Sequence, residues 1–172
     1  GINRLSIGIQ SFQPHFLKKL GRVHSEQEAL LAPEIAQQAG FTNFNLDLMF
    51  GLPGQTATLA MDDLKQALKF NPPHLSWYQL TIEPNTEFYS RPPALPATAI
   101  IENMQEEGIT LLETEGFERY EISAFSQPDQ QAEHNLNYWQ FGDYLGIGAG
   151  AHGKISLAQE NQIVRTRKTR QP

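Results

Sequence analysis

The sequence predicts an α/β protein built on a parallel sheet, either open or closed into a barrel. Short apolar runs that suit buried strands alternate with longer segments of helical periodicity, and glycine or proline stands at most boundaries between them. The 172 residues are 40% hydrophobic and 10% aromatic, which is enough for one well-packed core. Strands that alternate with helices in this way favour parallel pairing.

The first forty residues predict one strand and two helices. Residues 4–9 are a short apolar run bounded by polar residues, typical of a buried strand, and Gln10 falls at its end. Residues 14–20 suit a helix that ends at a glycine. A capping box opens a longer helix at Ser25, and Pro33 is expected to kink this helix or split it.

The middle of the chain continues the alternation. Residues 44–50 predict a second strand, and residues 59–70 predict an amphipathic helix that an Asn-Pro-Pro sequence stops. Residues 75–82 are β-branched and aromatic, as expected for a third strand. A proline-rich connector leads to a long helix that ends at Gly116, and residues 118–123 predict one more strand.

Charge and residue types argue against several functional classes. The formal net charge is −6, so most of the chain repels nucleic-acid phosphates, and four cations among the last eight residues are typical of a solvated strand or loop. No apolar run approaches the roughly 20 residues of a transmembrane helix. The chain has no cysteine, so it offers neither disulfides nor thiolate ligands, and we expect a cytoplasmic protein.

Polar residues fall near the ends of the predicted strands. Because ligands bind at the carboxyl ends of parallel strands, Gln10, Asp47 and Thr81 are candidate ligand residues. Asp47 lies within an apolar run, and its carboxylate needs a partner if it is buried. A ribose diol and a backbone amide of the loop at residues 51–54 both remain open as that partner. His15, His24 and His74 lack metal-ligand spacing, and we expect ordinary surface or loop histidines.

Residues 134–153 combine two histidines, several aromatic residues and closely spaced glycines. Aromatic faces, imidazoles and a backbone free of side chains together suit a pocket for a flat, unsaturated ligand. The alternative is a structural segment, in which Tyr138 and Trp139 form a small core and the glycines form turns. In that alternative Asn135 caps a turn and His134 bonds to backbone.

Four motifs carry a resemblance to a known family. They are Asn3-Arg-Leu-Ser-Ile-Gly-Ile-Gln-Ser-Phe12, Asn45-Leu-Asp-Leu-Met-Phe-Gly-Leu-Pro-Gly-Gln-Thr56, Trp77-Tyr-Gln-Leu-Thr-Ile-Glu-Pro-Asn-Thr86 and His134-Asn-Leu-Asn-Tyr-Trp139. The chain resembles the radical S-adenosylmethionine (radical SAM) proteins of the oxygen-independent coproporphyrinogen III oxidase group, most closely their haem chaperone branch. The resemblance covers essentially the whole chain. It implies part of a TIM-like (β/α) barrel, present as an internal fragment.

The resemblance also implies roles for individual residues. Gln10, Arg22 and Asp47 match positions that contact S-adenosylmethionine in the oxidases, and arginine suits the carboxylate of that cofactor. Thr81 matches a further contact at which the oxidases have alanine. Ala151 and His152 match a loop near the adenine of the cofactor.

For haem, the resemblance points to residues 134–139. His134 is the candidate iron ligand, and Asn135, Tyr138 and Trp139 are candidate contacts of the porphyrin. The resemblance implies that residues 1–124 are the C-terminal part of the barrel. Residues 125–172 would then close the barrel and start the following region.

One feature departs from the family pattern. The relatives bind a [4Fe–4S] cluster through a three-cysteine loop, whereas this chain has no cysteine, so we expect the cluster ligands to lie outside it. Reductive cleavage of the cofactor needs an electron from that cluster, so the chain alone is predicted to be inactive.

The resemblance leaves three functions open. The first is haem delivery to an acceptor protein, the second is oxidative decarboxylation of coproporphyrinogen III, and the third is ligand binding by an α/β domain without a cluster. An incomplete barrel leaves strand edges unpaired, so we also expect some self-association.

Overall fold

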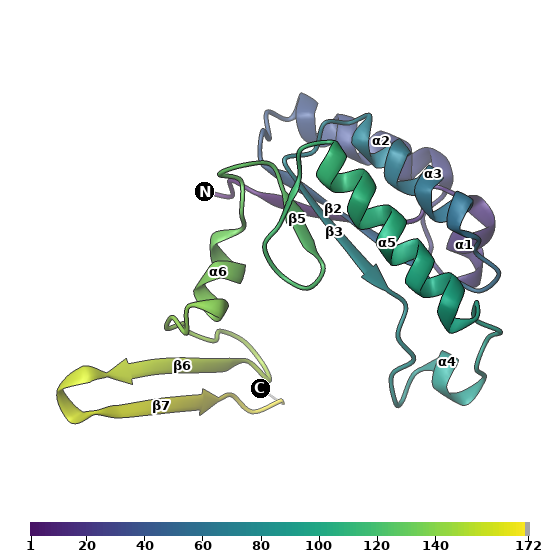
Figure 1. Cartoon of the computed structure of the whole chain (residues 1–172). Helices are drawn as coiled ribbons and strands as arrows, with labels where there is room; N and C mark the ends of the chain where they lie inside the picture. The colour runs from purple at the N-terminus through teal and green to yellow at the C-terminus, as the bar shows by residue number, and fades with distance from the viewer. Residues whose placement is uncertain (171–172) are drawn as a thin grey trace. The chain divides into compact units, whose positions relative to one another are not determined.

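A computed structural model describes residues 1–170, which form two compact units. The first unit is Gly1–Gln131 and the second begins at Ala132, and each is described by itself (Figure 1). The expected functional division, with a barrel part at residues 1–124 and a closing segment at 125–172, stays a prediction. Gln171 and Pro172, the end of that predicted segment, lie outside the described residues.

A five-stranded sheet forms the centre of the first unit, with strand order β1-β2-β3-β5-β4. The three strands predicted from the first half of the chain pair in parallel: β1 (Leu5–Gln10), β2 (Phe44–Phe50) and β3 (His74–Gln79). The α/β class with a parallel sheet is therefore confirmed. β2 has the predicted bounds, and Gln10 is the last residue of β1.

The other edge of the sheet differs from the prediction. Residues 118–123 do not form one strand, because β4 (Glu118–Arg119) turns back within four residues into β5 (Ala124–Ser126). β5 pairs antiparallel with both β3 and β4. A connection of four residues permits only antiparallel pairing, since a parallel crossover needs a dozen residues or more.

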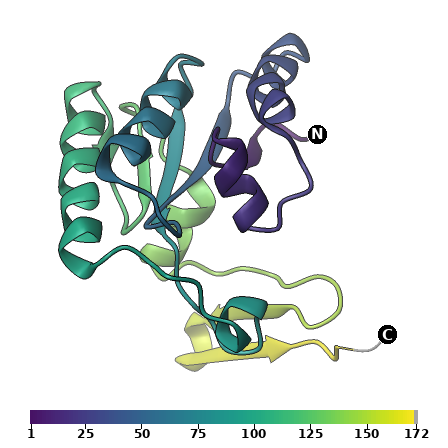
Figure 2. The ribbon, with the colours of Figure 1, turned by 90° about the vertical axis from the view of Figure 1, so that its right-hand side faces the viewer.

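Helices α2 (Glu26–Gln38), α3 (Ala57–Leu68) and α5 (Thr98–Thr114) lie in sequence along one face of the sheet (Figures 1 and 2). The predicted capping box of α2 is present between Ser25 and Glu28. α2 continues through Pro33, so of the two expected outcomes the split is wrong and the kink stays a prediction. The loss of one backbone hydrogen bond does not end a helix whose buried side chains pack on the unit. Short helices α1 (Pro14–Lys19) and α4 (Glu87–Ser90) lie in the connections that follow β1 and β3.

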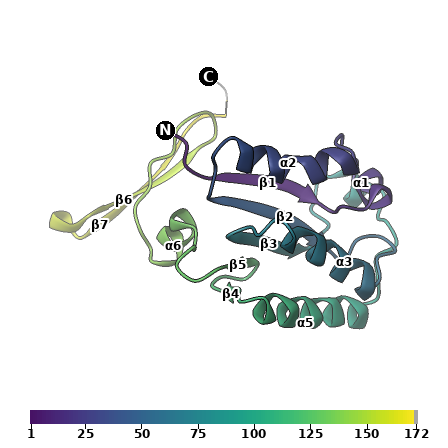
Figure 3. The same cartoon turned by 90° about the horizontal axis from the view of Figure 1, so that it is seen from above.

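The main core lies between the sheet and these helices (Figure 3). Trp77 of β3 packs on Gly108 of α5 so closely that a Cβ added at Gly108 would lie 1.8 Å from the indole ring. Glycine in a helix costs roughly 1 kcal/mol relative to alanine, and here it makes room for the largest side chain of the core. The fully buried members of this core include Leu46, Leu48, Leu64, Leu75, Met104 and Leu112.

The second unit contains helix α6 (Glu133–Trp139), followed by a hairpin of β6 (His152–Leu157) and β7 (Gln162–Arg167) joined through a short 3₁₀ turn at Ala158–Glu160. Lys154 is buried, and its Nζ donates to Asp143 Oδ1 at 2.8 Å and to the carbonyl of Phe141 at 2.8 Å. The hydrogen bond from Lys154 to Asp143 lowers the pKa of the Asp143 carboxyl. The cationic tail includes the end of β7, so a strand, one of the two structures predicted for the tail, is present. No helix among the described residues has the length and apolarity that crossing a bilayer requires.

Candidate functional site

The face of the sheet that points away from the helices is lined by polar side chains. Successive side chains of a strand point to opposite faces, so residues that share a face are two apart. In β2 the apolar Leu46 and Leu48 face the core, and Asn45 and Asp47 face the other way. The pairing of β2 with β3 places Ser76 beside Asp47 on this face.

Asp47 is held by two side-chain donors. Ser6 Oγ of β1 donates to Asp47 Oδ2 at 3.0 Å, and Asn45 Nδ2 donates to Asp47 Oδ1 at 2.7 Å. The partner of this carboxylate within the chain is therefore a pair of neighbouring side chains rather than an amide of the loop at residues 51–54. Asp47 lies at the middle of β2 and not near its end. A carboxylate accepts about four hydrogen bonds, so Asp47 keeps capacity for a ligand hydroxyl.

Below Asp47 the network continues to His74. The His74 Nδ1 and the Asn45 Oδ1 lie 2.6 Å apart, and the other ring nitrogen bonds to the Tyr120 hydroxyl. Ser76 Oγ also donates to Asn45 Oδ1, at 3.1 Å. His74 is 1% exposed, so the expectation of a surface or loop histidine is wrong for this residue. Asn45 on β2 and Tyr120 after β4 form hydrogen bonds with the two ring nitrogens of His74, and these bonds offset the free-energy cost of burying the imidazole.

Gln10 has an unusual backbone. Its φ is +67°, and the Ser11 N–H donates across it to the Ile9 carbonyl at 2.9 Å, which is the hydrogen bond of a three-residue turn. A left-handed φ at a residue other than glycine costs free energy and persists only where its surroundings impose it. This turn redirects the chain at the carboxyl end of β1.

Asp63 of α3 holds that turn. Its Oδ2 accepts from Ser11 Oγ at 2.7 Å, and its Oδ1 accepts from the Phe12 N–H at 2.9 Å. Asp63 is 1% exposed, and burial raises its pKa to about 6 in spite of these bonds. A buried carboxylate beneath the turn therefore fixes the backbone next to Gln10.

Tyr78 links the predicted ligand residues. Its hydroxyl donates to Gln10 Oε1 at 2.9 Å. Burial raises the pKa of the Tyr78 phenol and the Asp47 charge raises it further, whereas the Gln10 bond and the Arg22 charge oppose that rise. Gln10 thus contacts the Tyr78 hydroxyl directly, and the charges of Asp47 and Arg22 both act on the same phenol. The structure thus brings together three residues that are far apart in the sequence.

Arg22 is exposed in the loop between α1 and α2. The next histidine along the loop, His24, places its Nε2 3.1 Å from the Ile9 carbonyl, so this loop is tied to the end of β1. His24 is half-buried and bonds to backbone. The guanidinium of Arg22 is therefore a positive group at the rim of the polar face.

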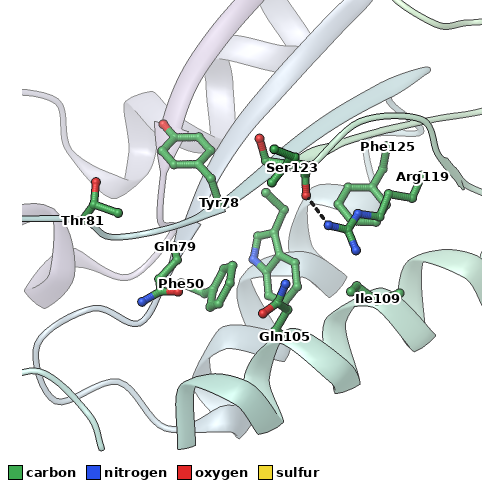
Figure 4. A pocket seen from close by; sticks show the side chains of 11 residues that line it. Phe50, Tyr78, Gln79, Thr81, Gln105, Ile109, Arg119, Ser123 and Phe125 are labelled. Atoms are coloured by element: carbon green, nitrogen blue, oxygen red, sulfur yellow. Dashed lines mark hydrogen bonds between the residues drawn. The ribbon is translucent and has the colours of Figure 1, made fainter. Parts of the chain in front are cut away.

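Thr81 follows β3 and lines a cleft of about 260 Å³ together with Tyr78. Figure 4 shows Tyr78 and Thr81 on one side of the end of β3, whereas Phe50 and Gln105 lie on the other side. Across the cleft, Arg119 donates to the carbonyls of Glu121 and Ile122 at 3.2 and 2.7 Å. Thr81 thus lies at the same end of the sheet as Gln10.

The predicted haem residues lie on α6 in the second unit. His134 and Tyr138 are four residues apart, so they share one side of the helix. His134 is exposed, and its ring makes no hydrogen bond within the described residues. Tyr138 and Trp139 are 58% and 60% exposed. Asn135 lies in the first turn of the helix, whose N-cap is Ala132, and its capping role stays a prediction.

Ala151 and His152 also belong to the second unit. His152 begins β6 and is exposed, and the Ala151 carbonyl accepts from the Lys168 N–H at 2.8 Å. The backbone of His152 lies against Gly146, where an added Cβ would come within 2.2 Å of its carbonyl oxygen. Glycine is therefore required at position 146 by the close approach of the two backbone segments. The adenine contacts predicted for Ala151 and His152 stay predictions.

The donor sets suit some cofactors and not others. Carboxylate, amide, phenol and guanidinium groups around Tyr78 suit a polar nucleoside with an amino acid part. Imidazole and aromatic rings on α6 suit a porphyrin with iron. An iron–sulfur cluster does not fit this chain, which has no cysteine, and the described residues include no group of three or more metal-binding side chains.

Comparisons with known proteins show what the chain is similar to in sequence and in fold. Residues 1–70 match the Radical SAM superfamily. In structure, the chain is similar to coproporphyrinogen III oxidase (HemN) from Escherichia coli, a radical SAM enzyme, with a TM-score of 0.74 and 26% identity over 89% of this chain and 39% of that chain. The chain is thus similar to radical SAM proteins in the sequence of residues 1–70 and in its fold.

The chain is also similar in sequence to the haem chaperone HemW. It is 55% identical to HemW of Escherichia coli strain K12 and 52% identical to HemW of Haemophilus influenzae strain ATCC 51907, each over 100% of this chain and 45% of the relative. The chain thus spans a little less than half the length of these relatives.

Sequence reasoning missed several residues of the polar face, namely Ser6, Asn45, Ser76, Tyr78 and Tyr120. A signal for most of them was present. In Phe44-Asn-Leu-Asp-Leu and in Leu75-Ser-Trp-Tyr the polar residues stand at every second position, which marks a strand with one polar face. Tyr78 was hidden because an aromatic residue in a strand suggests packing.

Proposed function

We propose that the protein containing this chain is a haem chaperone of the radical SAM type, which binds S-adenosylmethionine and haem and delivers haem to an acceptor protein. The observation that carries this proposal is the 55% identity to a haem chaperone over the full length of the chain. Because the chain spans 45% of that relative, the proposed activity is that of the complete protein.

For S-adenosylmethionine we propose Gln10, Arg22, Asp47 and Thr81 as contacts, with Ala151 and His152 near the adenine. The grouping of Gln10, Asp47 and Arg22 around Tyr78 supports this assignment. Asp47 would accept from a ribose hydroxyl and Arg22 would pair with the carboxylate. Thr81 would contact the ligand at the rim of the cleft.

For haem we propose His134 as iron ligand, with Asn135, Tyr138 and Trp139 beside the porphyrin. Support comes from the exposed imidazole and the exposed aromatic side chains on α6. Neighbouring exposed aromatic side chains are typical of surfaces that bind a ligand or a partner.

A [4Fe–4S] cluster bound elsewhere in the complete protein would supply the electron for reductive cleavage of S-adenosylmethionine. In this chain the polar face would bind and orient the cofactor. The α/β domain without a cluster is the alternative if the complete protein lacks cysteines at suitable spacing.

The main alternative is coproporphyrinogen III oxidase, favoured by the structural similarity to HemN. A haem titration and a coproporphyrinogen III turnover assay on the complete protein with its cluster separate the two. A chaperone binds haem with a defined stoichiometry and forms no protoporphyrinogen IX. Turnover of coproporphyrinogen III would contradict the proposal.

The haem residues are tested by His134→Ala in the complete protein. Loss of the axial ligand should change the haem absorption spectrum and weaken haem binding about tenfold or more, since tenfold corresponds to 1.4 kcal/mol. His15→Ala, which removes an exposed histidine of α1, is the matched control and should leave both unchanged. An unchanged spectrum in His134→Ala would assign the iron to another ligand.

A further inference from the structure

Gln10 has one bonded end and one free end. Its Oε1 accepts from the Tyr78 hydroxyl at 2.9 Å. Its Nε2 makes no hydrogen bond to the described residues, and Gln10 as a whole is 6% exposed. The nitrogen is not among the fully buried side-chain atoms that lack a partner, so it is reached by solvent and remains available to donate to a ligand.

Two neighbours fix which end is free. The phenol is the donor to the oxygen end, and burial, together with the Asp47 charge, raises its pKa, so it stays protonated and donates. Gly8 lies below the nitrogen end, where an added Cβ would lie 2.9 Å from Gln10 Nε2. Any side chain at position 8 would push the amide out of this place.

We propose that Tyr78 is a positioning residue of the cofactor site: it takes up the oxygen of the Gln10 amide, so that Gln10 meets S-adenosylmethionine only as a hydrogen-bond donor. This inference rests on the proposed binding of that cofactor. Under this proposal, each side chain on the polar face has a different hydrogen-bonding role. Asp47 accepts from ligand hydroxyls, Gln10 donates to a ligand oxygen or ring nitrogen, and Tyr78 touches Gln10 rather than the ligand.

The test is a double-mutant cycle on the complete, cluster-loaded protein, with S-adenosylmethionine affinity measured by anaerobic calorimetry. Tyr78→Phe removes only the hydroxyl and should weaken binding up to about tenfold, the effect of one hydrogen bond. In a Gln10→Ala background the same change should have no further effect, because Tyr78 acts through Gln10. Tyr89→Phe, at an exposed tyrosine of α4, is the matched control.

Gln10→Glu tests the direction of the hydrogen bond. A carboxylate still accepts from Tyr78 but cannot donate, so binding at pH 8 should fall about tenfold or more, as in Gln10→Ala. At pH 5.5 partial protonation restores a donor, and Gln10→Glu should bind more tightly than Gln10→Ala. Asp63, whose pKa is about 6, and the neighbouring Asp47, Arg22 and His24 are present in both variants, so the pH effects that the two variants share cancel in this ratio.

The outcomes separate the two proposals. If the wild-type protein binds no S-adenosylmethionine, the proposed cofactor site fails, and this inference fails with it. If the wild type binds but Tyr78→Phe is unchanged, or is equally harmful in the Gln10→Ala background, only the positioning role is overturned. Circular dichroism and melting temperature of each variant identify any loss of binding that comes from misfolding.

Discussion

The two faces of the β1–β3 sheet share a backbone and differ in every second side chain. Toward the helices, Leu46, Leu48 and Leu75 are 0% exposed and pack in one apolar cluster. On the opposite face, Asn45, Asp47 and Ser76 form a chain of hydrogen bonds that reaches His74. The apolar face stabilises the unit by packing against the helices. On the opposite face, hydrogen bonds hold the polar side chains in fixed positions.

The difference between the two faces predicts how substitutions on each of them affect stability and ligand binding. A buried apolar side chain contributes through many contacts that no neighbour replaces. When one polar side chain is removed from a hydrogen-bond network, the remaining members still form hydrogen bonds with each other. Substitutions on the helix face should therefore lower stability, whereas substitutions on the polar face should lower ligand binding first.

The largest effect on stability is expected for Leu48→Ala. Removing this fully buried side chain should destabilise the fold by about 2–5 kcal/mol, through lost burial and the cavity that remains. Urea unfolding of the complete protein measures it. A loss no larger than that of Ser76→Ala would contradict the contrast between the two faces.

The next effect concerns pH and Asp63, which joins α3 to the turn at Gln10. Because the folded pKa is raised from 3.8 to about 6, the protonated form stabilises the fold below pH 3.8, and this contribution is lost as pH rises through about 6. That pKa difference corresponds to roughly 3 kcal/mol. Asp63→Asn should remove this pH dependence.

Unfolding of wild type and Asp63→Asn at pH 4.0 and 7.5 measures the Asp63 contribution. The variant should gain stability relative to wild type at the higher pH. Asp62→Asn, at the exposed neighbour on α3, should show no such gain. Equal slopes for wild type and Asp63→Asn would show that Asp63 titrates normally.

A smaller change in stability, with a large change in binding, is expected for Asp47→Asn. Hydrogen bonds to a charged group contribute about 1.5–3 kcal/mol, so S-adenosylmethionine affinity should fall about tenfold to a hundredfold. Stability should change by about 1 kcal/mol, because Ser6 and Asn45 retain their bond to each other at 2.7 Å. Calorimetry and melting curves measure the two quantities. A stability loss as large as that of Leu48→Ala would make Asp47 a structural residue.

The smallest effect is expected for Ser76→Ala. Asn45 Oδ1 loses one donor at 3.1 Å but keeps its bond with His74, so the cost should be below about 1 kcal/mol. S-adenosylmethionine affinity should stay within twofold, by roughly 0.4 kcal/mol, of the wild-type value. A larger loss of affinity would extend the ligand site down the strand to Ser76.

The sequence predicted those parts of the fold that depend on local pattern. The alternation in residues 44–50 and the capping box at Ser25 are local signals, and both elements are present as predicted. The β4–β5 hairpin was missed because pairing partners are set by the chain that surrounds them. α6 was missed because His, Asn, Tyr and Trp are weak helix formers.

For the site, the resemblance named Gln10, Arg22 and Asp47, but it could not name what positions them. The Tyr78 hydroxyl and the Asp63 carboxylate come from elements 68 and 52 residues away from their partners Gln10 and Ser11. Contacts at such separations follow from strand order and helix packing, which only coordinates provide.

The contact of Trp77 with Gly108 has an evolutionary consequence. An indole that touches a helix backbone ties the identities of two positions together, since a methyl group at position 108 has no room while the indole is present. Relatives that carry alanine or a larger residue at 108 should carry a smaller residue at 77. A pair of substitutions should therefore succeed where either alone fails, and drift along this lineage should pass through both positions together.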